Sequence, residues 1–268
     1  MKITASTLTL FNTFYPSAGR LLGLSILIGG LGIPGRRAAR ELKGKMDKTI
    51  TKVQIEDSTL YHADCWDVFD EIGKVDIVIT DPPYGIGENN KQNLSRGCLA
   101  KSTDYGFYDW DRQKINKKYT DKIISLSKNL IIFGGNYYSD RFFPSSGWIV
   151  WDKENRKTHF ADCELIYTSF DKAVRKIKFN WNGMWQGDMK NKEKRVHPTQ
   201  KPEYVMKWII ANYTKETDLV LDPFMGSGTT GVACAAGRRK FIGVEKEKRY
   251  FDIACERIEW AYRKLSLY

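Results

Sequence analysis

Two apolar, β-branched runs of this chain end in the same dipeptide, Asp-Pro, and this repetition restricts the fold more than any other feature. The run Val75–Thr80 precedes Asp81, and the run Leu219–Leu221 precedes Asp222. Short runs of this composition are typical of strands that are buried on both faces of a parallel sheet. Because ligands collect at the carboxyl ends of such strands, we expect both aspartates at one functional edge of the sheet.

Strand-like and helix-like patterns alternate along the rest of the chain. Helices are predicted over residues 65–72, 117–128, 201–214, 229–237 and 249–265, from apolar residues at helical spacing. A β-hairpin is predicted over residues 52–64, and strands over 75–80, 130–135, 147–153, 163–170, 218–224 and 240–245. This alternation indicates an α/β fold with a mostly parallel sheet that helices cover on both faces.

The chain has 268 residues, which suffices for one large α/β domain. Residues 1–46 differ in composition from the rest and contain an apolar, glycine-rich run, Leu21–Ile33, that is too short to span a bilayer. We expect residues 1–46 to form a poorly ordered leader and residues 47–268 to form a single domain. Within that domain, the polar stretch 85–118 is expected to be an inserted loop, and loops of that length are usually functional or mobile.

The positive charge of the chain is unevenly distributed. The formal net charge is +11, and residues 1–45 contribute +6 of it with seven Lys or Arg and one acid, so the remainder carries only +5. Within that remainder, Lys172–Lys201 holds nine Lys or Arg and two acids, a net charge of +7. Such a concentration is typical of a contact with a phosphate backbone. The alternative is a charged face that is merely solvated.

Five cysteines are scattered along the chain without a close pair: Cys65, Cys98, Cys163, Cys234 and Cys255. This spacing argues against a disulfide framework and against a zinc site, and it fits a reducing cytosol. The sequence therefore predicts a cytoplasmic protein with no bound metal and no membrane segment.

Residues 219–245 combine a strand, a glycine-rich turn, a helix and a second strand. Glu245 ends the second strand, where a carboxylate can accept hydrogen bonds from a ribose diol. The turn matches the dinucleotide fingerprint Gly-x-Gly-x-x-Gly only loosely, and such a match is weak by itself. Asp222, directly before the turn, would repel a pyrophosphate but suits a ligand with an ammonium and a sulfonium. S-adenosylmethionine has both groups, a ribose and no phosphate.

Three motifs give the chain a specific resemblance to a known family. They are TDPPYG (Thr80–Gly85), HPTQKP (His197–Pro202) and DPFMGSGTT (Asp222–Thr230). With these motifs, and over about residues 50–265, the chain resembles the amino-methyltransferases of DNA, in the branch whose catalytic motif precedes the cofactor motif. The resemblance implies the Rossmann-like fold of S-adenosylmethionine-dependent methyltransferases, with a mostly parallel seven-stranded sheet and helices on both faces.

The resemblance also assigns roles to matching positions. The catalytic tetrapeptide is Asp81, Pro82, Pro83 and Tyr84. The expected cofactor-binding residues are Asp64, Lys201, Asp222, Pro223, Phe224, Gly226, Gly228, Thr229, Thr230 and Glu245. A recognition segment of about residues 170–197 is expected to contact DNA through Lys176, Lys178, Trp181, Trp185, Lys192, Lys194 and Arg195. His197 is expected to be structural.

The tetrapeptide suits the chemistry of an exocyclic amine, whose lone pair is delocalised into the ring. If Asp81 and the Pro82 carbonyl accept its two N–H groups, the lone pair is directed at the methyl group. The base must leave the duplex to reach the site, and stacking on Tyr84 would offset part of that cost. Four aromatic residues of the 85–118 loop, Tyr105, Phe107, Tyr108 and Trp110, either close over the site or form a separate apolar cluster.

The expected function is therefore site-specific methylation of adenine N6 in double-stranded DNA, since Asp81 rather than Ser opens the tetrapeptide. Cytosine N4 methylation is the nearest alternative. A non-catalytic DNA-binding module, an RNA or protein-amide methyltransferase and a nicotinamide-dependent dehydrogenase are more distant ones. The resemblance leaves open two further partners, a second copy of the chain in a homodimer and a cognate restriction endonuclease.

Overall fold

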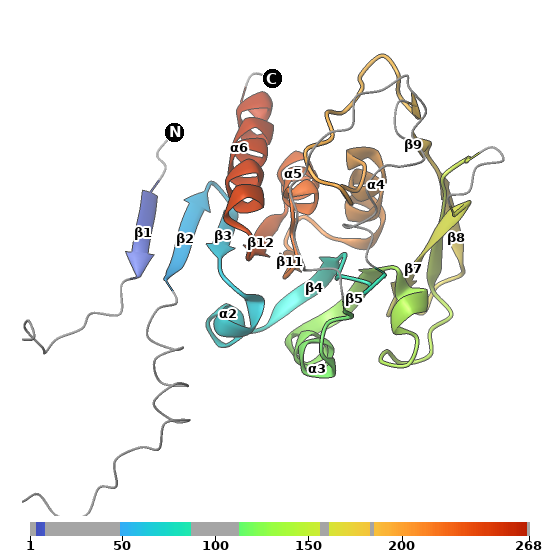
Figure 1. Ribbon diagram of the computed structural model, residues 1–268, viewed down its shortest axis with the longest axis horizontal. Coiled ribbons are helices and arrows are strands. Elements are labelled where there is room, and N and C mark those ends of the chain that lie inside the picture. The colour runs from blue at the N-terminus through green and yellow to red at the C-terminus, as the bar shows by residue number, and fades with distance from the viewer. Residues whose placement is uncertain (1–3, 9–48, 87–112, 156–160, 183–184, 267–268) are drawn as a thin grey trace, which may run out of the picture.

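The chain folds around one mixed sheet that helices cover on both faces (Figure 1). The computed structural model describes residues 4–8, 49–86, 113–155, 161–182 and 185–266. The strands of the sheet are β1 (Thr4–Leu8), β2 (Ile50–Ile55), β3 (Ser58–His62), β4 (Val75–Thr80), β5 (Ser127–Phe133), β6 (Trp148–Asp152), β7 (Cys163–Thr168), β8 (Arg175–Lys178), β11 (Leu219–Asp222) and β12 (Lys240–Glu245). Two short strands, β9 (Trp181–Asn182) and β10 (Trp185–Gln186), pair separately.

The order of the ten strands is β1-β2-β3-β12-β11-β4-β5-β7-β6-β8. The five central strands, β3, β12, β11, β4 and β5, are parallel to one another. The sheet has ten strands among the described residues, where the resemblance implied seven; β1 and β8 were not predicted, and β2 is the first strand of the predicted hairpin. β8 comes from the recognition segment, for which no strand was predicted; it pairs in parallel with β6.

The helices agree with the predicted ones to within a few residues. They are α2 (Cys65–Ile72), α3 (Lys117–Leu126), α4 (Glu203–Tyr213), α5 (Thr229–Ala236) and α6 (Lys248–Leu265), with a short 3₁₀ helix η2 at Gly135–Tyr138. Side chains cap two of them, since Asp64 accepts from the Trp66 amide and Asn116 accepts from the Lys118 amide. No helix in the described part of the chain combines the length and apolar character needed to cross a bilayer.

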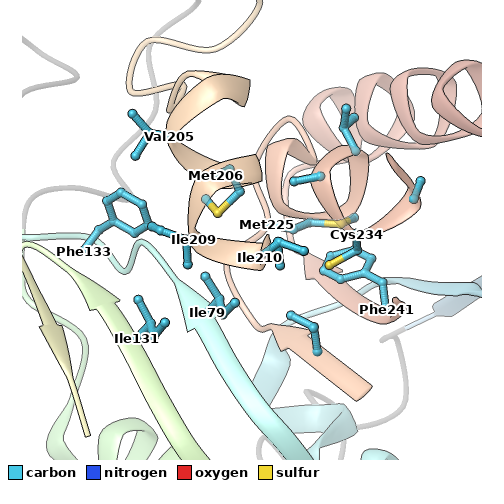
Figure 2. Packing of buried hydrophobic residues seen from close by; sticks show 14 of the residues in the cluster. Ile79, Ile131, Phe133, Val205, Met206, Ile209, Ile210, Met225, Cys234 and Phe241 are labelled. Carbon is cyan, nitrogen blue, oxygen red and sulfur yellow. The ribbon is translucent and has the colours of Figure 1, made fainter. Parts of the chain in front are cut away.

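Alternating side chains on the central strands build two cores on opposite faces of the sheet. On β4, Ile77 and Ile79 belong to one core and Val78 to the other, as the two-residue period of a strand requires. Helices α4, α5 and α6 cover the first core, where Figure 2 shows Met206, Ile209 and Ile210 of α4 above Ile79 and Ile131 of the sheet. Helices α2 and α3 cover the second core, which contains Val68, Phe69, Ile123 and Leu126.

The expected leader and the expected inserted loop are described only in part. Thr4–Leu8, which belong to the expected leader, form β1 and pair antiparallel with β2. Residues 9–48 and 87–112 lie outside the described residues, so the leader and the inserted loop remain predictions. The aromatic residues Tyr105, Phe107, Tyr108 and Trp110 belong to that part of the chain. The two ends of the inserted loop are close together, because Tyr84 and Lys114 form an antiparallel bridge.

Asp76 joins three neighbouring strands near the amino-terminal end of β4, whereas Asp81 follows the carboxyl end of the same strand. One carboxylate oxygen of Asp76, on β4, accepts from the Leu219 amide of β11 at 3.0 Å. The other pairs with the Lys128 ammonium of β5 at 2.6 Å. The Leu219 amide, followed by Lys128, lowers the pKa of Asp76. The side chain therefore fixes where β11 begins relative to β4.

We expect Asp76→Ala to lower the free energy of unfolding by about 1 kcal/mol near neutral pH, because the Leu219 amide loses its acceptor. The folded pKa of Asp76 is depressed, so this contribution is present above the unfolded pKa of about 3.9 and disappears as the pH falls through the folded pKa. Chemical denaturation at neutral pH and in acid measures the loss in the free energy of unfolding and its dependence on pH. Asp70→Ala, which removes an exposed partner of Lys122, is the matched control; equal losses in both variants would contradict the assignment.

Candidate active site

Four acidic residues converge because they follow four parallel strands. Asp64 comes after β3, Glu245 ends β12, Asp222 ends β11 and Asp81 follows β4. These strands are neighbours in the sheet, in the order β3-β12-β11-β4. After β4 the chain continues to β5 on one side, and after β11 it continues to β12 on the other side. The connections therefore run in opposite directions from the neighbouring strands β4 and β11, and a crevice is expected between the carboxyl ends of these two strands. A cavity of about 320 Å³ lies there, and all four acids line it.

This cavity brings together most of the residues predicted to bind a cofactor. Asp64, Lys201, Asp222, Pro223, Phe224, Gly226, Thr229, Thr230 and Glu245 line it, with Asp81 and Pro83 of the tetrapeptide. Gly228 is not among the lining residues. It precedes α5 with φ of +77°, and a Cβ there would lie 2.8 Å from the Cβ of Ala254 on α6. Gly228 therefore permits a left-handed turn and a close helix contact.

Asp222 connects three elements at the floor of the cavity. Its Oδ1 accepts from the Thr80 hydroxyl at 2.6 Å and from the Phe224 amide at 3.1 Å. Its Oδ2 accepts from the Thr230 hydroxyl at 2.6 Å. Burial raises the pKa of Asp222 to about 6, although these three donors oppose the shift. The side chain thus ties the end of β4 to the glycine turn and to the first turn of α5.

Glu245 holds the glycine turn from the neighbouring strand. One carboxylate oxygen accepts from the Gly226 amide at 2.9 Å, and the other accepts from the Glu247 amide at 2.7 Å. Burial raises the pKa of Glu245 to about 7. Gly226 has φ of +51°, a left-handed conformation that favours glycine. The turn is therefore shaped by the acid that was predicted to bind ribose.

Two further side chains fix this turn from α6 and from the HPTQKP motif. The Arg257 guanidinium donates to the Ser227 carbonyl at 2.7 Å and pairs with Glu203 of α4 at 3.2 Å. His197 lines the cavity and stacks edge-on against Tyr250, with ring centroids 4.1 Å apart. Burial, with Lys201 and Arg257, lowers the pKa of His197 to about 3, so the imidazole is neutral. These contacts agree with the structural role expected of His197.

Asp64 lines the cavity from the start of α2. It caps α2, and its Oδ1 also accepts from the Tyr119 hydroxyl of α3 at 3.2 Å. Lys246 lies 3.5 Å from its Oδ2. Asp64, Tyr119 and Phe224 all line the cavity, so an acid and two aromatic rings are available in it for a heterocycle.

Hydroxyl groups hold the tetrapeptide that was predicted to be catalytic. The Tyr84 hydroxyl lies within hydrogen-bond distance of Asp81 Oδ1, and the Tyr138 hydroxyl of η2 donates to the Pro83 carbonyl. The ring of Tyr84 stacks on Tyr137, with centroids 4.7 Å apart and planes 15° from parallel. Gly134 lies against the same ring, and a Cβ there would come within 2.3 Å of it. The glycine is therefore needed for the position of Tyr84.

A buried charge network joins the tetrapeptide to three other elements. The Lys201 ammonium pairs with Asp81 Oδ2 and lies 3.3 Å from Glu164 Oε1 of β7. Glu164 Oε1 also accepts from the Tyr84 hydroxyl at 2.9 Å. Glu164 Oε2 pairs with the Lys153 ammonium at 3.0 Å. Lys201 was predicted to bind cofactor; the structure places its ammonium between Asp81 and Glu164.

The two acids of this network differ in their pKa for a physical reason. Burial raises the pKa of Asp81, whose only neighbouring ammonium among the described residues, that of Lys201, is shared with Glu164. Burial acts in the same direction on Glu164, but Lys201 and Lys153 together lower the pKa of that carboxyl to about 2. Burial beside both acids raises the pKa of Tyr84 well above its usual value, so its hydroxyl keeps the proton.

The predicted DNA contacts are divided between two places. Lys176 and Lys178 lie on β8 at the sheet edge, where Lys176 pairs with Asp152 at 2.7 Å and Lys178 lies 4.0 Å from Glu154. Trp181 is a core residue instead of a surface one: it is 7% exposed and its indole N–H donates to the Gln200 carbonyl at 2.8 Å. The prediction that Trp181 contacts DNA is thus corrected.

Two of the four remaining predicted contacts line a second cavity. Lys192 and Lys194 line it together with Tyr204 and Trp260, and Trp185 is 68% exposed nearby in sequence. The Arg195 guanidinium lies over the Trp181 ring, 4.8 Å from its centroid. Gln186 and Glu193 exchange two hydrogen bonds of 2.8 Å, which close the segment between them.

Sequence reasoning missed Glu164, Lys153, Tyr137, Tyr138 and Arg257. Glu164 carried a signal, because it is an acid in a predicted strand, CELIYTSF, that is otherwise mostly apolar. No such signal marked the others, since each is an ordinary residue of a loop or a helix. Their roles depend on pairing between elements that are distant in the chain, such as β7 beside β5.

The fold occurs in a known DNA methyltransferase structure. The cytosine-N4-specific PvuII DNA methyltransferase superposes with a TM-score of 0.50 over 78% of this chain and 92% of that one, at 14% sequence identity. At this identity the likeness concerns the fold.

Sequence comparisons give the family. A family model of the N6/N4 methyltransferase type, described as DNA methylase, matches residues 97–256. The Type II methyltransferase M2.DpnII of Streptococcus pneumoniae is 33% identical, with 69% of this chain and 82% of that protein covered. The Type II methyltransferase M2.LlaDCHI of Lactococcus lactis subsp. cremoris is 31% identical, with 76% and 90% covered. With its tetrapeptide, glycine turn and strand-end acids around one cavity, this chain belongs to the N6/N4 DNA methylase family.

Proposed function

We propose that this chain transfers a methyl group from S-adenosylmethionine to the exocyclic N6 of adenine in double-stranded DNA. The observation that carries the proposal is the single cavity in which Asp81 of the tetrapeptide meets Asp222 and Glu245 of the glycine-turn unit. A site for an amine and a site for a cationic nucleoside are thereby adjacent. Family membership and the names of the two Type II methyltransferases support the same reaction.

The cavity suits S-adenosylmethionine in its charge. Its described lining includes five carboxyl groups, Asp64, Asp81, Asp222, Glu245 and Glu247, but only two lysines, Lys201 and Lys246. Such a lining favours a ligand with an ammonium and a sulfonium and disfavours a pyrophosphate. The three donors to Asp222 use three of the four acceptor positions of a carboxylate, so among the described residues one position is left to accept from a ligand ammonium.

Asp81 and the Pro82 carbonyl would act on the target base. When bound, S-adenosylmethionine supplies an electrophilic methyl group on sulfur. Asp81 and the Pro82 carbonyl accept the two N–H groups of the amine, which draws the nitrogen towards tetrahedral geometry and orients its lone pair. The Asp81 carboxylate also stabilises positive charge that develops on nitrogen. The neutral His197 has no proton-transfer role in this scheme.

Adenine is the proposed target because Asp opens the tetrapeptide, with cytosine N4 as the alternative that product analysis would reveal. DNA contacts are assigned to Lys192, Lys194, Arg195 and Trp185, with Lys176 and Lys178 available at the edge of the sheet if they exchange their acidic partners for phosphates. A homodimer, a cognate restriction endonuclease and a cytoplasmic location belong to the same proposal.

Asp81→Ala should slow methyl transfer by about 100- to 1,000-fold, the size of effect that follows loss of one charge-stabilising group. Affinity for S-adenosylmethionine should change by only a few-fold, since Asp81 faces the amine. Tritium transfer into unmethylated DNA, nucleoside analysis of the product and calorimetry with S-adenosylmethionine test this division. Asp140→Ala, an exposed acid beside η2, is the control. Affinity that falls in step with activity would refute the assignment, and N4-methylcytosine as product would replace adenine.

Cofactor affinity should depend on pH through Glu245 and Asp222. Burial raises their pKa to about 7 and about 6, so both carboxyls gain protons as the pH falls through the neutral range. A cationic ligand binds the ionised forms. Affinity for S-adenosylmethionine should therefore fall from about pH 8 to about pH 6, and binding near pH 7 should release protons. Calorimetry in buffers of different ionisation enthalpy measures this release.

Glu245→Gln should weaken binding about tenfold or more and reduce the proton release, because one titrating group is lost. Glu216→Gln changes an exposed acid before β11 and serves as the control. Proton release that is the same in both variants would show that Glu245 does not meet the cofactor.

Lys192→Gln together with Lys194→Gln should weaken DNA binding and flatten its salt dependence by about one unit of slope per lost phosphate contact. Methylation should slow at all sites alike, since phosphate contacts position the protein without selecting sequence. The matched control is Lys215→Gln with Lys240→Gln. This double variant removes the same charge near the amino-terminal ends of β11 and β12, away from the cavity at their carboxyl ends. Binding to one duplex at several salt concentrations decides; equal slopes in both double variants would place the contact elsewhere.

A further inference from the structure

Glu164 is a buried charged residue to which the proposed function gives no role. It comes from β7, which is separated from β4 by β5. Its side chain is 11% exposed. Both carboxylate oxygens are engaged: Oε1 faces the Tyr84 hydroxyl at 2.9 Å and the Lys201 ammonium at 3.3 Å, and Oε2 faces the Lys153 ammonium at 3.0 Å. Glu164 does not line the cofactor cavity among its described residues.

The Tyr84 hydroxyl has one proton and two carboxylates within reach. It lies within hydrogen-bond distance of Asp81 Oδ1 and of Glu164 Oε1. At any moment it can donate to one of these oxygens. Donation to Asp81 occupies an acceptor that the target amine needs, whereas donation to Glu164 leaves that acceptor open. The presence of Glu164 therefore determines whether Asp81 Oδ1 can accept from the target amine.

We propose that Glu164 is a positioning residue for methyl transfer: it accepts the hydrogen bond of the Tyr84 hydroxyl, so that Asp81 Oδ1 is open to the N–H of the target amine. This role rests on the function proposed above. Glu164 touches neither the amine nor the cofactor, and it acts through Tyr84.

The two lysines make Glu164 the better acceptor. Lys201 lies between Asp81 Oδ2 and Glu164 Oε1, which keeps the two acids adjacent without net repulsion. Lys153 pairs with Glu164, whereas no ion pair with Asp81 is found for it. With two ammonium groups beside it Glu164 stays ionised, and an ionised carboxylate accepts from a hydroxyl and cannot donate. A neutral side chain at position 164 would be a weaker acceptor, and the Tyr84 hydroxyl would then donate its hydrogen bond to Asp81.

Glu164→Gln tests the proposal, since it keeps the shape of the side chain and removes the charge. The single-turnover rate of tritium transfer from S-adenosylmethionine to unmethylated DNA should fall about 10- to 100-fold, the range for one hydrogen bond to a charged group. The dissociation constant for S-adenosylmethionine should stay within a few-fold. Glu71→Gln is the matched control, because Glu71 likewise accepts from a tyrosine hydroxyl (Tyr61, 2.9 Å) and a lysine (Lys52, 2.8 Å), far from Asp81.

Tyr84→Phe separates positioning from a merely structural effect. Without the hydroxyl, nothing at position 84 competes for Asp81 Oδ1, so Glu164→Gln in the Tyr84→Phe background should slow the reaction only a few-fold. If Glu164→Gln does not fold, Glu164→Asp replaces it; this variant keeps the charge between the lysines and withdraws the carboxylate from the hydroxyl. The same loss of rate with unchanged cofactor affinity is expected.

Three outcomes would overturn the positioning role: an unchanged rate in Glu164→Gln, a loss of cofactor affinity as large as the loss of rate, or equal losses with and without the Tyr84→Phe substitution. These outcomes require that the unaltered chain binds S-adenosylmethionine and labels DNA. An unaltered chain that does neither would instead refute the proposed function itself.

Discussion

The hydrogen bonds of the Asp222 carboxylate are the interaction on which the rest of the site depends. One side chain receives donors from β4, from the glycine turn and from α5. Because the tetrapeptide follows β4 and the glycine turn leads into α5, these bonds fix the positions of the two motifs relative to each other. A buried carboxylate that lost its donors would be costly, so the three bonds are made together or the local fold changes.

The second organising feature is a balance of buried charge. Asp81 and Glu164 face Lys201 and Lys153 in a region that excludes much of the solvent. Removal of a single member leaves an uncompensated charge, which is more disruptive than removal of a surface pair. The polar part of the site is therefore as tightly specified as the apolar cores on either side of the sheet.

The sequence predicted the central strands, the helices and the edge where the acids meet, because apolar periodicity and motif order are local properties. It predicted β12 at Lys240–Glu245 and α2 at Cys65–Ile72 without error. It missed β8 and assigned Trp181 to a DNA contact, because the segment was interpreted by its charge; Ile177, Phe179 and Trp181 in fact alternate with polar residues, and all three are buried. Glu164 required knowledge of which strand lies beside which, and that is a property of the whole fold.

The hydrogen bonds that close the recognition segment have a consequence for how such enzymes diversify. Trp181 is anchored to Gln200, and Gln186 and Glu193 pair across the segment, so its two ends meet at the core. Between the paired residues, the tip at 187–192 can be lengthened or exchanged at a small entropic cost and without a shift of the catalytic strands. The length and sequence of this tip can therefore vary independently of the acids that line the cavity.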